Sequence, residues 1–128
     1  MAADAPKPLK FTRDMRIKQG RDFTRIRQKG LRLVHGCLIV NWLKTSPDSP
    51  CRLGVVTSGK IGNAVIRNRA RRLMREAFRK HQHDLIAPVD LVLVARQSIV
   101  GKALGGVEKD FLTTLRKAGL LKQTNGDN

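Results

Sequence analysis

The amino-acid sequence predicts a mixed α/β sandwich, a single domain in which helices pack on a β-sheet. Three observations support this fold class. The chain has 128 residues, which suits one domain, and 41% of them are hydrophobic, which is enough for a core. Helix-like and strand-like segments also follow one another in the order helix, three strands, helix, strand and helix, with no internal repeat.

The domain organisation follows from the two ends of the chain. Residues 1–12 contain proline and lysine without periodicity and predict a flexible basic arm, while residues 122–128 predict a polar tail. Residues 13–121 remain as the folded domain. The chain has no apolar run long enough to span a membrane and no apolar signal segment at its start, so we expect a cytoplasmic protein.

The first half of the domain predicts one helix and three strands. Phe23 and Ile26 lie three apart in a short helix over residues 19–29, which ends at Gly30. Three apolar runs then predict strands, at residues 31–34, 37–43 and 52–58. Turn residues at 45–50 separate the last two strands, which we expect to form an antiparallel hairpin.

The second half predicts two helices around one buried strand. The longest helical pattern runs from residue 64 to about residue 80, with Asn63 as its N-cap. Residues 90–95 predict a buried strand. Gly105 and Gly106 then interrupt the pattern, and the last helix follows with one apolar face formed by Val107, Phe111, Leu115 and Ala118.

The charge balance indicates a polyanionic partner. Lys and Arg total 26 against 10 Asp and Glu, a formal net charge of +16, and Asp48 is the only acid from Phe23 to Arg75. Nucleic acid, an acidic membrane surface and an acidic protein all fit a field of this sign. The predominance of arginine favours phosphate, because a guanidinium can bind two oxygens at once. Aromatic residues are only 4%, so base stacking is at most local.

The helix expected at 64–80 has one apolar face and one cationic face. At about 100° per residue, Ile66, Ala70, Leu73 and Ala77 gather on one side, with Met74 beside them. Arg67, Arg71, Arg75 and Arg79 line up on the other side, flanked by Asn68 and Arg72, with Arg69 and Phe78 at the two borders. Because solvated faces usually mix both signs of charge, this row favours docking on phosphates over a merely solvated face.

The loop that precedes this helix has two open interpretations. The glycine-containing stretch from Ser58 to Asn63 is either a plain turn and cap or an anion-binding helix entrance. It lacks the spacing of a nucleotide-binding P-loop, so nucleotide hydrolysis has no support.

Residues 60–79, KIGNAVIRNRARRLMREAFR, closely resemble the signature of the bacterial ribonuclease P protein component family. The Arg-Asn-Arg triplet at 67–69 is its most specific part. The resemblance covers roughly residues 15–118 and includes RIK at 16–18, Asp22-Phe23, Gly30, Leu53-Gly54 and LVAR at 93–96. It implies an αβββαβα fold with a mixed four-stranded sheet, in which the arginine-rich helix lies in a left-handed βαβ crossover.

The resemblance also implies a function. Proteins of this family are subunits of a ribonucleoprotein endoribonuclease that removes the 5′ leader of precursor tRNA by Mg²⁺-dependent hydrolysis. The implied partners are a catalytic RNA, which contains the catalytic centre, and precursor tRNA, with a monomeric protein in a 1:1 complex. Mg²⁺ would be held mainly by RNA, and neither an organic cofactor nor a membrane is implied.

The resemblance assigns candidate residues by position. The catalytic RNA would contact Arg67, Asn68, Arg69, Arg71, Arg72, Arg75 and Arg79. A cleft for the leader would include Lys18, Phe23, Arg27, Arg52, Ser58, Lys60 and Arg96. The family commonly has aromatic residues where this chain has Arg27 and Asn41, and a lysine where it has Gly59. We therefore expect leader binding to depend more on charge and less on stacking.

Other sites have little support in the sequence. The histidines and cysteines lack zinc-ligand spacing, the carboxylates are scattered, and no nucleophilic triad is recognisable. Cys37 and Cys51 read as small apolar residues and Trp42 as a core residue, while Phe23 and Ile26 fit the core and the cleft equally. A ribosomal or general RNA-binding protein and a metal-dependent nuclease acting alone remain the alternative functions.

Overall fold

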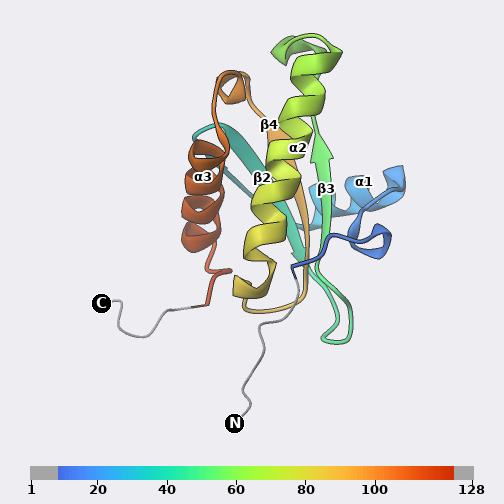
Figure 1. The fold of residues 1–128 in the computed structure, drawn as a ribbon. Helices are drawn as coiled ribbons and strands as arrows, with labels where there is room; N and C mark the ends of the chain where they lie inside the picture. Colours follow the sequence, from blue (N-terminus) through green and yellow to red (C-terminus); the bar gives the residue numbers. More distant parts are fainter. Residues whose placement is uncertain (1–8, 123–128) are drawn as a thin grey trace, which may run out of the picture.

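A computed structural model of the chain describes residues 9–122, in which helices cover both faces of one β-sheet (Figure 1). The helices are α1 (Gly20–Lys29), α2 (Ala64–His81) and α3 (Leu104–Lys117), and the strands are β1 (Leu31–His35), β2 (Leu38–Lys44), β3 (Arg52–Val56) and β4 (Val89–Ala95). The expected αβββαβα order is therefore confirmed. Short 3-10 turns join several of these elements, among them Arg13–Met15 before α1 and Gly59–Ile61 before α2.

The sheet is mixed and has the strand order β1-β2-β4-β3. Strand β4 pairs antiparallel with β2 and parallel with β3, so β2 and β3 are not neighbours. The expected antiparallel hairpin between the strands at 37–43 and 52–58 is therefore wrong. Its physical reason is that β4 is apolar on both faces and almost wholly buried, so it takes the central position between them. The tight hairpin is β1-β2, which turns at Gly36 with a φ of +58°.

Helix α2 connects the parallel neighbours β3 and β4. In Figure 1, β3 rises on the right, α2 crosses in front of the sheet, and β4 lies on the left of β3. This connection is left-handed, as the resemblance implies. It places α2 over the edge strand β3, where one side of the helix stays open to solvent.

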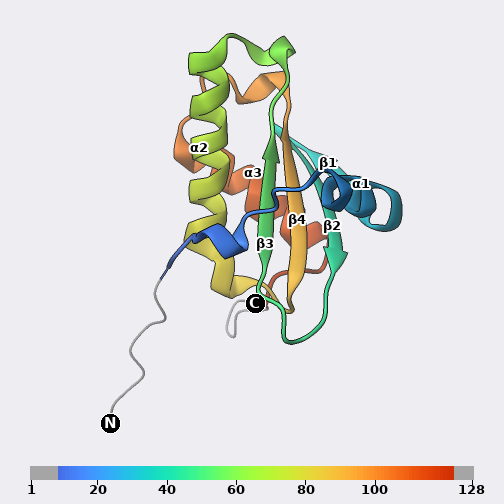
Figure 2. The ribbon, with the colours of Figure 1, turned by 90° about the vertical axis from the view of Figure 1, so that its right-hand side faces the viewer.

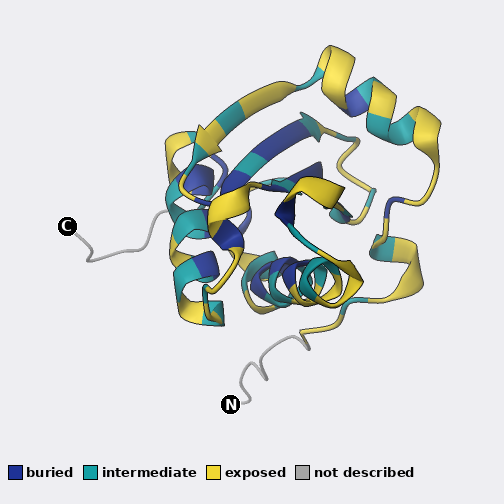
Figure 3. Cartoon of the chain, turned by 90° about the horizontal axis from the view of Figure 1, so that it is seen from above, coloured by how far each residue is buried: buried dark blue, intermediate teal, exposed yellow. Residues whose placement is uncertain are grey.

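The two faces of the sheet carry different helices: α2 and α3 cover one face, and α1 covers the other (Figure 2). Leu91 and Leu93 of β4 point into the larger core, whereas Val92 packs with Ile26 of α1. Trp42 is 6% exposed and belongs to the larger core, which confirms its expected core position. Figure 3 shows the buried residues gathered between the helices and the sheet.

The N-termini of α2 and α3 compare differently with the expectations from the sequence. The Asn63 side chain accepts a hydrogen bond from the Ile66 amide at 3.1 Å, which confirms the expected N-cap of α2. The expected interruption at Gly105 and Gly106 is wrong, because both glycines lie in the first turn of α3. The buried residues Val107 and Phe111 hold that end of the helix against the core.

The expected arm (1–12) and the expected tail (122–128) lie only partly within the described residues. Residues 1–8 and 123–128 lie outside them. Leu9 and Lys10, part of the expected arm, accept hydrogen bonds from Arg79 of α2 and from its C-cap residue Gln82. The Lys122 amide donates to the Asp84 carbonyl at 2.8 Å. Within residues 9–122, no helix is both long enough and apolar enough to cross a membrane.

Candidate nucleic-acid interface

Helix α2 is anchored by a buried side and presents polar residues on the opposite side. Ala70, Met74, Ala77 and Phe78 are buried, so Phe78 lies in the core and not at the border of the apolar face as expected. The exposed side carries Val65, Asn68, Arg69 and Arg72, whereas Arg67, Arg71 and Arg75 are half-buried along the flank. The helix thus offers two adjacent rows of cations.

Among the described residues, these arginines have no acidic partners. Within the described part of the chain, no carboxylate forms an ion pair with Arg67, Arg69, Arg71, Arg72 or Arg75. Arg71 donates instead to the Asn68 side-chain oxygen at 2.7 Å. Burial lowers the pKa of Arg75, and the neighbouring charges of Arg16 and Arg71 lower it further. The flank of α2 therefore has a positive potential that an anionic ligand would relieve.

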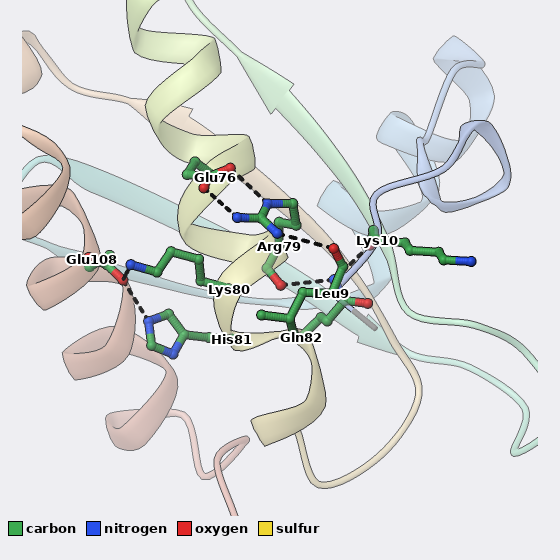
Figure 4. A network of polar contacts seen from close by, with 8 residues as sticks. All are labelled: Leu9, Lys10, Glu76, Arg79, Lys80, His81, Gln82 and Glu108. Carbon is green, nitrogen blue, oxygen red and sulfur yellow. Dashed lines mark hydrogen bonds and ion pairs between the residues drawn. The ribbon is translucent and has the colours of Figure 1, made fainter. Parts of the chain in front are cut away.

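Arg79 differs from the other arginines of α2. Its guanidinium donates to both carboxylate oxygens of Glu76, at 2.9 and 2.6 Å, and to the Leu9 carbonyl at 3.1 Å (Figure 4). The ion pair raises the pKa of Arg79 and lowers the pKa of Glu76. The structure thus separates Arg79 from the row in which the sequence places it.

A hollow of about 400 Å³ lies beside β3, where the elements on the two faces of the sheet meet. The Ile17 amide donates to the Leu53 carbonyl at 2.9 Å, so residues 16–18 run along the outer edge of this strand. The hollow is lined by Arg16, Ile17, Lys18, Phe23, Leu53, Gly54, Val55 and Arg75. Arg75 thereby joins the cationic flank of α2 to the hollow.

At the floor of the hollow, the aromatic ring of Phe23 packs directly on Gly54. A Cβ atom at Gly54 would lie 2.5 Å from Cε1 of Phe23, so only glycine lets the ring approach this strand so closely. Phe23 is half-buried, whereas Ile26, one turn later, is wholly buried. Phe23 therefore both packs on the sheet and lines the hollow, and Ile26 is a core residue.

Arg52, an expected cleft residue, is held by buried charge. Its Nε and Nη2 donate to the two carboxylate oxygens of Asp90 at 2.9 and 2.8 Å, and Asp22 lies 3.7 Å from Nη1. Arg25 also reaches Asp90, at 3.2 Å. The Asp90 side chain is 0% exposed, and its hydrogen bonds raise the pKa of Arg52. Arg52 therefore ties α1 to the sheet and does not line the hollow.

The remaining expected cleft residues do not line the hollow. Ser58 accepts a hydrogen bond from the Lys60 amide at 3.3 Å, in the turn after β3, and Lys60 is exposed. Arg96 follows β4 and donates to the Gly36 carbonyl at 2.8 Å. Arg27 is exposed on α1, one turn after Phe23. Of the seven expected residues, Lys18 and Phe23 line the hollow.

Sequence reasoning did not select Arg16 as a site residue. It begins the Arg-Ile-Lys run at 16–18, of which only Lys18 was assigned to the cleft. The pairing of this run with β3 brings Arg16 into the hollow beside Arg75. Because neighbours in an extended segment alternate in direction, Arg16 and Lys18 share one side, which is the signal that could have found it.

The side chains that could bind a metal or act as a nucleophile make contacts of other kinds. Among residues 9–122, no group of three or more His, Cys, Asp or Glu side chains could hold a metal ion. His81 lies between Glu108 and Asp84, with its ring nitrogens 2.9 and 3.2 Å from their oxygens. Burial, reinforced by Asp110, raises the pKa of the Cys37 thiol to about 12, so this free cysteine is a poor nucleophile.

Comparisons with known proteins identify one family for this chain. Residues 11–119 match the ribonuclease P family. The ribonuclease P protein component of Syntrophomonas wolfei is 39% identical over 105 residues, covering 82% of this chain and 87% of the relative. That of Gluconacetobacter diazotrophicus is 35% identical over 106 residues, covering 82% of this chain and 91% of the relative.

The solved structures show the same fold. The RNase P protein of Staphylococcus aureus superimposes with a TM-score of 0.76 at 30% identity, covering 84% of this chain and 98% of that one. The RNase P protein of Thermotoga maritima gives a TM-score of 0.72 at 28% identity, covering 80% and 96%. The family match therefore extends over the sheet, α2 and the hollow together, and the chain belongs to the ribonuclease P protein family.

Proposed function

We propose that this chain is the protein subunit of a ribonuclease P ribonucleoprotein. It binds the catalytic RNA and the 5′ leader of precursor tRNA, and it assists the Mg²⁺-dependent endonucleolytic removal of that leader. One observation carries the proposal: cations that have no acidic partner within residues 9–122 run from the exposed side of α2 to the hollow beside β3. A single chain can thus contact two RNA segments at once, as one protein in a 1:1 complex.

The catalytic RNA binds to α2. Because the helix is anchored by its buried side, Arg67, Asn68, Arg69, Arg71 and Arg72 are held at fixed spacing against a folded polyanion. Guanidinium groups recognise phosphates by charge and by paired hydrogen bonds, so the contact reads backbone shape and not base sequence. The tight turn before α2, where the Arg67 Nη1 would lie 3.6 Å from a Cβ at Gly59, extends this contact to Lys60.

The single-stranded leader lies in the hollow. Phe23 offers a ring on which a base can stack, while Arg16, Lys18 and Arg75 surround it with positive charge. Arg27 and Lys60 lie exposed beyond the hollow and extend the charge along the leader. Asn41 is 8% exposed on the sheet face that α1 covers, so it offers no second stacking ring. Charge therefore carries more of the leader affinity than stacking does.

The magnesium ions of the reaction belong to the RNA in this proposal. Bound there, they would supply the activation of water and the stabilisation of charge on the scissile phosphate. Among residues 9–122, no group of three or more His, Cys, Asp or Glu side chains could hold a metal ion, so the proposal assigns no catalytic metal to these side chains. Its own contribution is to bind both RNA segments and to neutralise phosphates close to the site of cleavage.

Reconstitution tests the function. The protein together with the catalytic RNA from the same cells should cleave precursor tRNA at low Mg²⁺, where either component alone is poor. Cleavage by the protein alone would support a metal-dependent nuclease instead. RNA binding without any effect on the RNA-catalysed reaction would support a ribosomal or general RNA-binding protein.

A further inference from the structure

Residues 9–16, here called the strap, cross the C-terminal half of α2 before the chain reaches β3. The Leu9 carbonyl accepts a hydrogen bond from Arg79 at 3.1 Å, and the Lys10 carbonyl accepts one from Gln82 at 2.6 Å (Figure 4). Two side chains at the C-terminal end of α2, Arg79 in its last turn and the C-cap residue Gln82, thus hold two successive peptide groups of the strap. These bonds join segments that are 70 and 72 residues apart in the sequence.

Aromatic contacts continue the attachment. The Phe11 ring meets the buried Phe78 ring edge to face, with centroids 5.7 Å apart and an interplanar angle of 70°. The Arg16 guanidinium carbon lies 5.1 Å from the centroid of the Phe11 ring, which is cation–π distance. At the end of the strap, Arg16 therefore packs against the Phe11 ring and lines the hollow.

The hydrogen bonds of Arg79 show that it is already engaged. Its Nε and Nη2 bind Glu76, and its Nη1 binds Leu9, so each nitrogen of the fork has an acceptor. A phosphate would have to compete with a carboxylate and a carbonyl for these donors. Arg72, on the exposed side of the same helix, has no such partners among the described residues.

We propose that Arg79 is a positioning residue for the tRNA leader and not a contact for the catalytic RNA. Arg79 holds the strap on α2, the strap fixes Arg16 at the hollow, and Arg16 is an additional leader-binding residue. This inference rests on the proposed function, because it concerns the same hollow. The charge of Arg16 already contributes to the lowered pKa of Arg75, so the two cations share one site.

Arg79→Lys in the reconstituted holoenzyme tests this inference, with Arg72→Lys as the matched control. Lysine keeps the charge, but a single ammonium cannot bind Glu76 and Leu9 as the fork does. We expect Arg79→Lys to lose about tenfold in affinity for precursor tRNA, to leave the affinity for leaderless tRNA unchanged, and to bind the catalytic RNA normally. Arg72→Lys should instead weaken binding of the catalytic RNA.

Two further variants separate positioning from a folding defect. Phe11→Ala removes the ring that supports Arg16, and Arg16→Gln removes the cation itself. Both should reproduce the loss of leader preference while the melting temperature stays within a few degrees of the unmodified protein. Normal leader preference in all three variants, or weakened binding of the catalytic RNA by Arg79→Lys, would overturn the inference alone. An unmodified holoenzyme without leader preference would overturn the proposed function as well.

Discussion

The two halves of α2 both carry cationic residues, five arginines from Arg67 to Arg75 and three residues at 79–81, but these two sets have different surroundings. In the N-terminal half, from Arg67 to Arg75, no carboxylate of the described residues pairs with an arginine. In the C-terminal half, Arg79 pairs with Glu76, while Lys80 and His81 both contact Glu108 of α3. A cation is open to a ligand only where no acid lies nearby in space, and helical periodicity alone does not reveal this.

The same contrast occurs on the two sides of β3. Arg52 is neutralised by the buried Asp90, whereas Arg16 and Lys18 line an open hollow at the strand's edge. The first set of charges stabilises the packing of α1 on the sheet. The second set lies open to an anionic ligand, and the proposed function assigns it to RNA binding.

The largest expected effect is on the structural side of this contrast. Asp90→Asn leaves Arg52 and Arg25 without their shared carboxylate, and the free energy of unfolding should fall by about 3 kcal/mol. Urea unfolding monitored by the single Trp measures it. The exposed Asp48→Asn should change stability by less than about 0.5 kcal/mol. Equal stability of the two variants would show that the buried pair does not hold α1.

The second effect concerns the open half of α2. Replacing Arg67 and Arg71 together with glutamine should weaken binding of the catalytic RNA by about thirtyfold, because two phosphate contacts are lost. The slope of log affinity against log salt should become shallower by about 1 to 2. Binding assays over a range of salt concentrations measure both quantities.

The control for this pair comes from the other half of the helix. Arg79→Gln with Lys80→Gln removes the same number of charges, but both residues already pair with carboxylates. This double variant should bind the catalytic RNA normally. If the Arg67 and Arg71 variant unfolds, these arginines hold the fold; if both double variants weaken binding equally, net charge and not position determines affinity.

The third effect concerns the floor of the hollow. Gly54→Ala places a Cβ 2.5 Å from the Phe23 ring, so the ring must move off the strand. Affinity of the holoenzyme for precursor tRNA should fall by about tenfold, while leaderless tRNA binds as before. Gly20→Ala, where a Cβ meets nothing within 4 Å, is the control. Unchanged leader affinity in Gly54→Ala would remove Phe23 from the leader site.

The order and type of the elements could be predicted from the sequence, but the order of the strands could not. Local signals are sufficient for α2, since Asn63 caps it and apolar residues recur at helical spacing. The turn residues at 45–50 show only that the chain leaves β2 and later enters β3. That β4 lies between them depends on its two apolar faces, which must both be covered.

The candidate site, too, could be predicted from the sequence only in part. The arginines of α2 could be predicted, because one helix places them on one surface. The pairing of Arg52 with Asp90 and the bond from Arg79 to Leu9 join residues 38 and 70 positions apart. Contacts at such separations leave no periodic signal in the sequence. The sequence therefore places Arg52 and Arg79 with the other expected RNA-binding residues. Helical spacing reveals Glu76 beside Arg79, but only the structure shows the bonds to Asp90 and Leu9.

The smallest effect tests the paired half of α2 through pH. The hydrogen bond from His81 and the nearby Lys80 charge lower the pKa of Glu108 below its ordinary value of 4.5. A carboxyl with a lowered folded-state pKa stabilises the fold above its unfolded pKa, and this contribution disappears as pH falls through the folded pKa. Glu108→Gln should therefore cost about 0.5 kcal/mol at neutral pH, a small value because the pair is partly exposed to solvent.

At a pH well below 4.5, Glu108 is protonated in the folded and unfolded states alike, so the two proteins should converge in stability. Thermal unfolding of both across this range gives the comparison. Asp48→Asn, in an exposed turn, should run parallel to the unmodified protein throughout. A constant gap between Glu108→Gln and the unmodified protein would mean that Glu108 acts by packing alone. Lys80 and His81 would then be as available to an anionic ligand as the arginines at the start of α2.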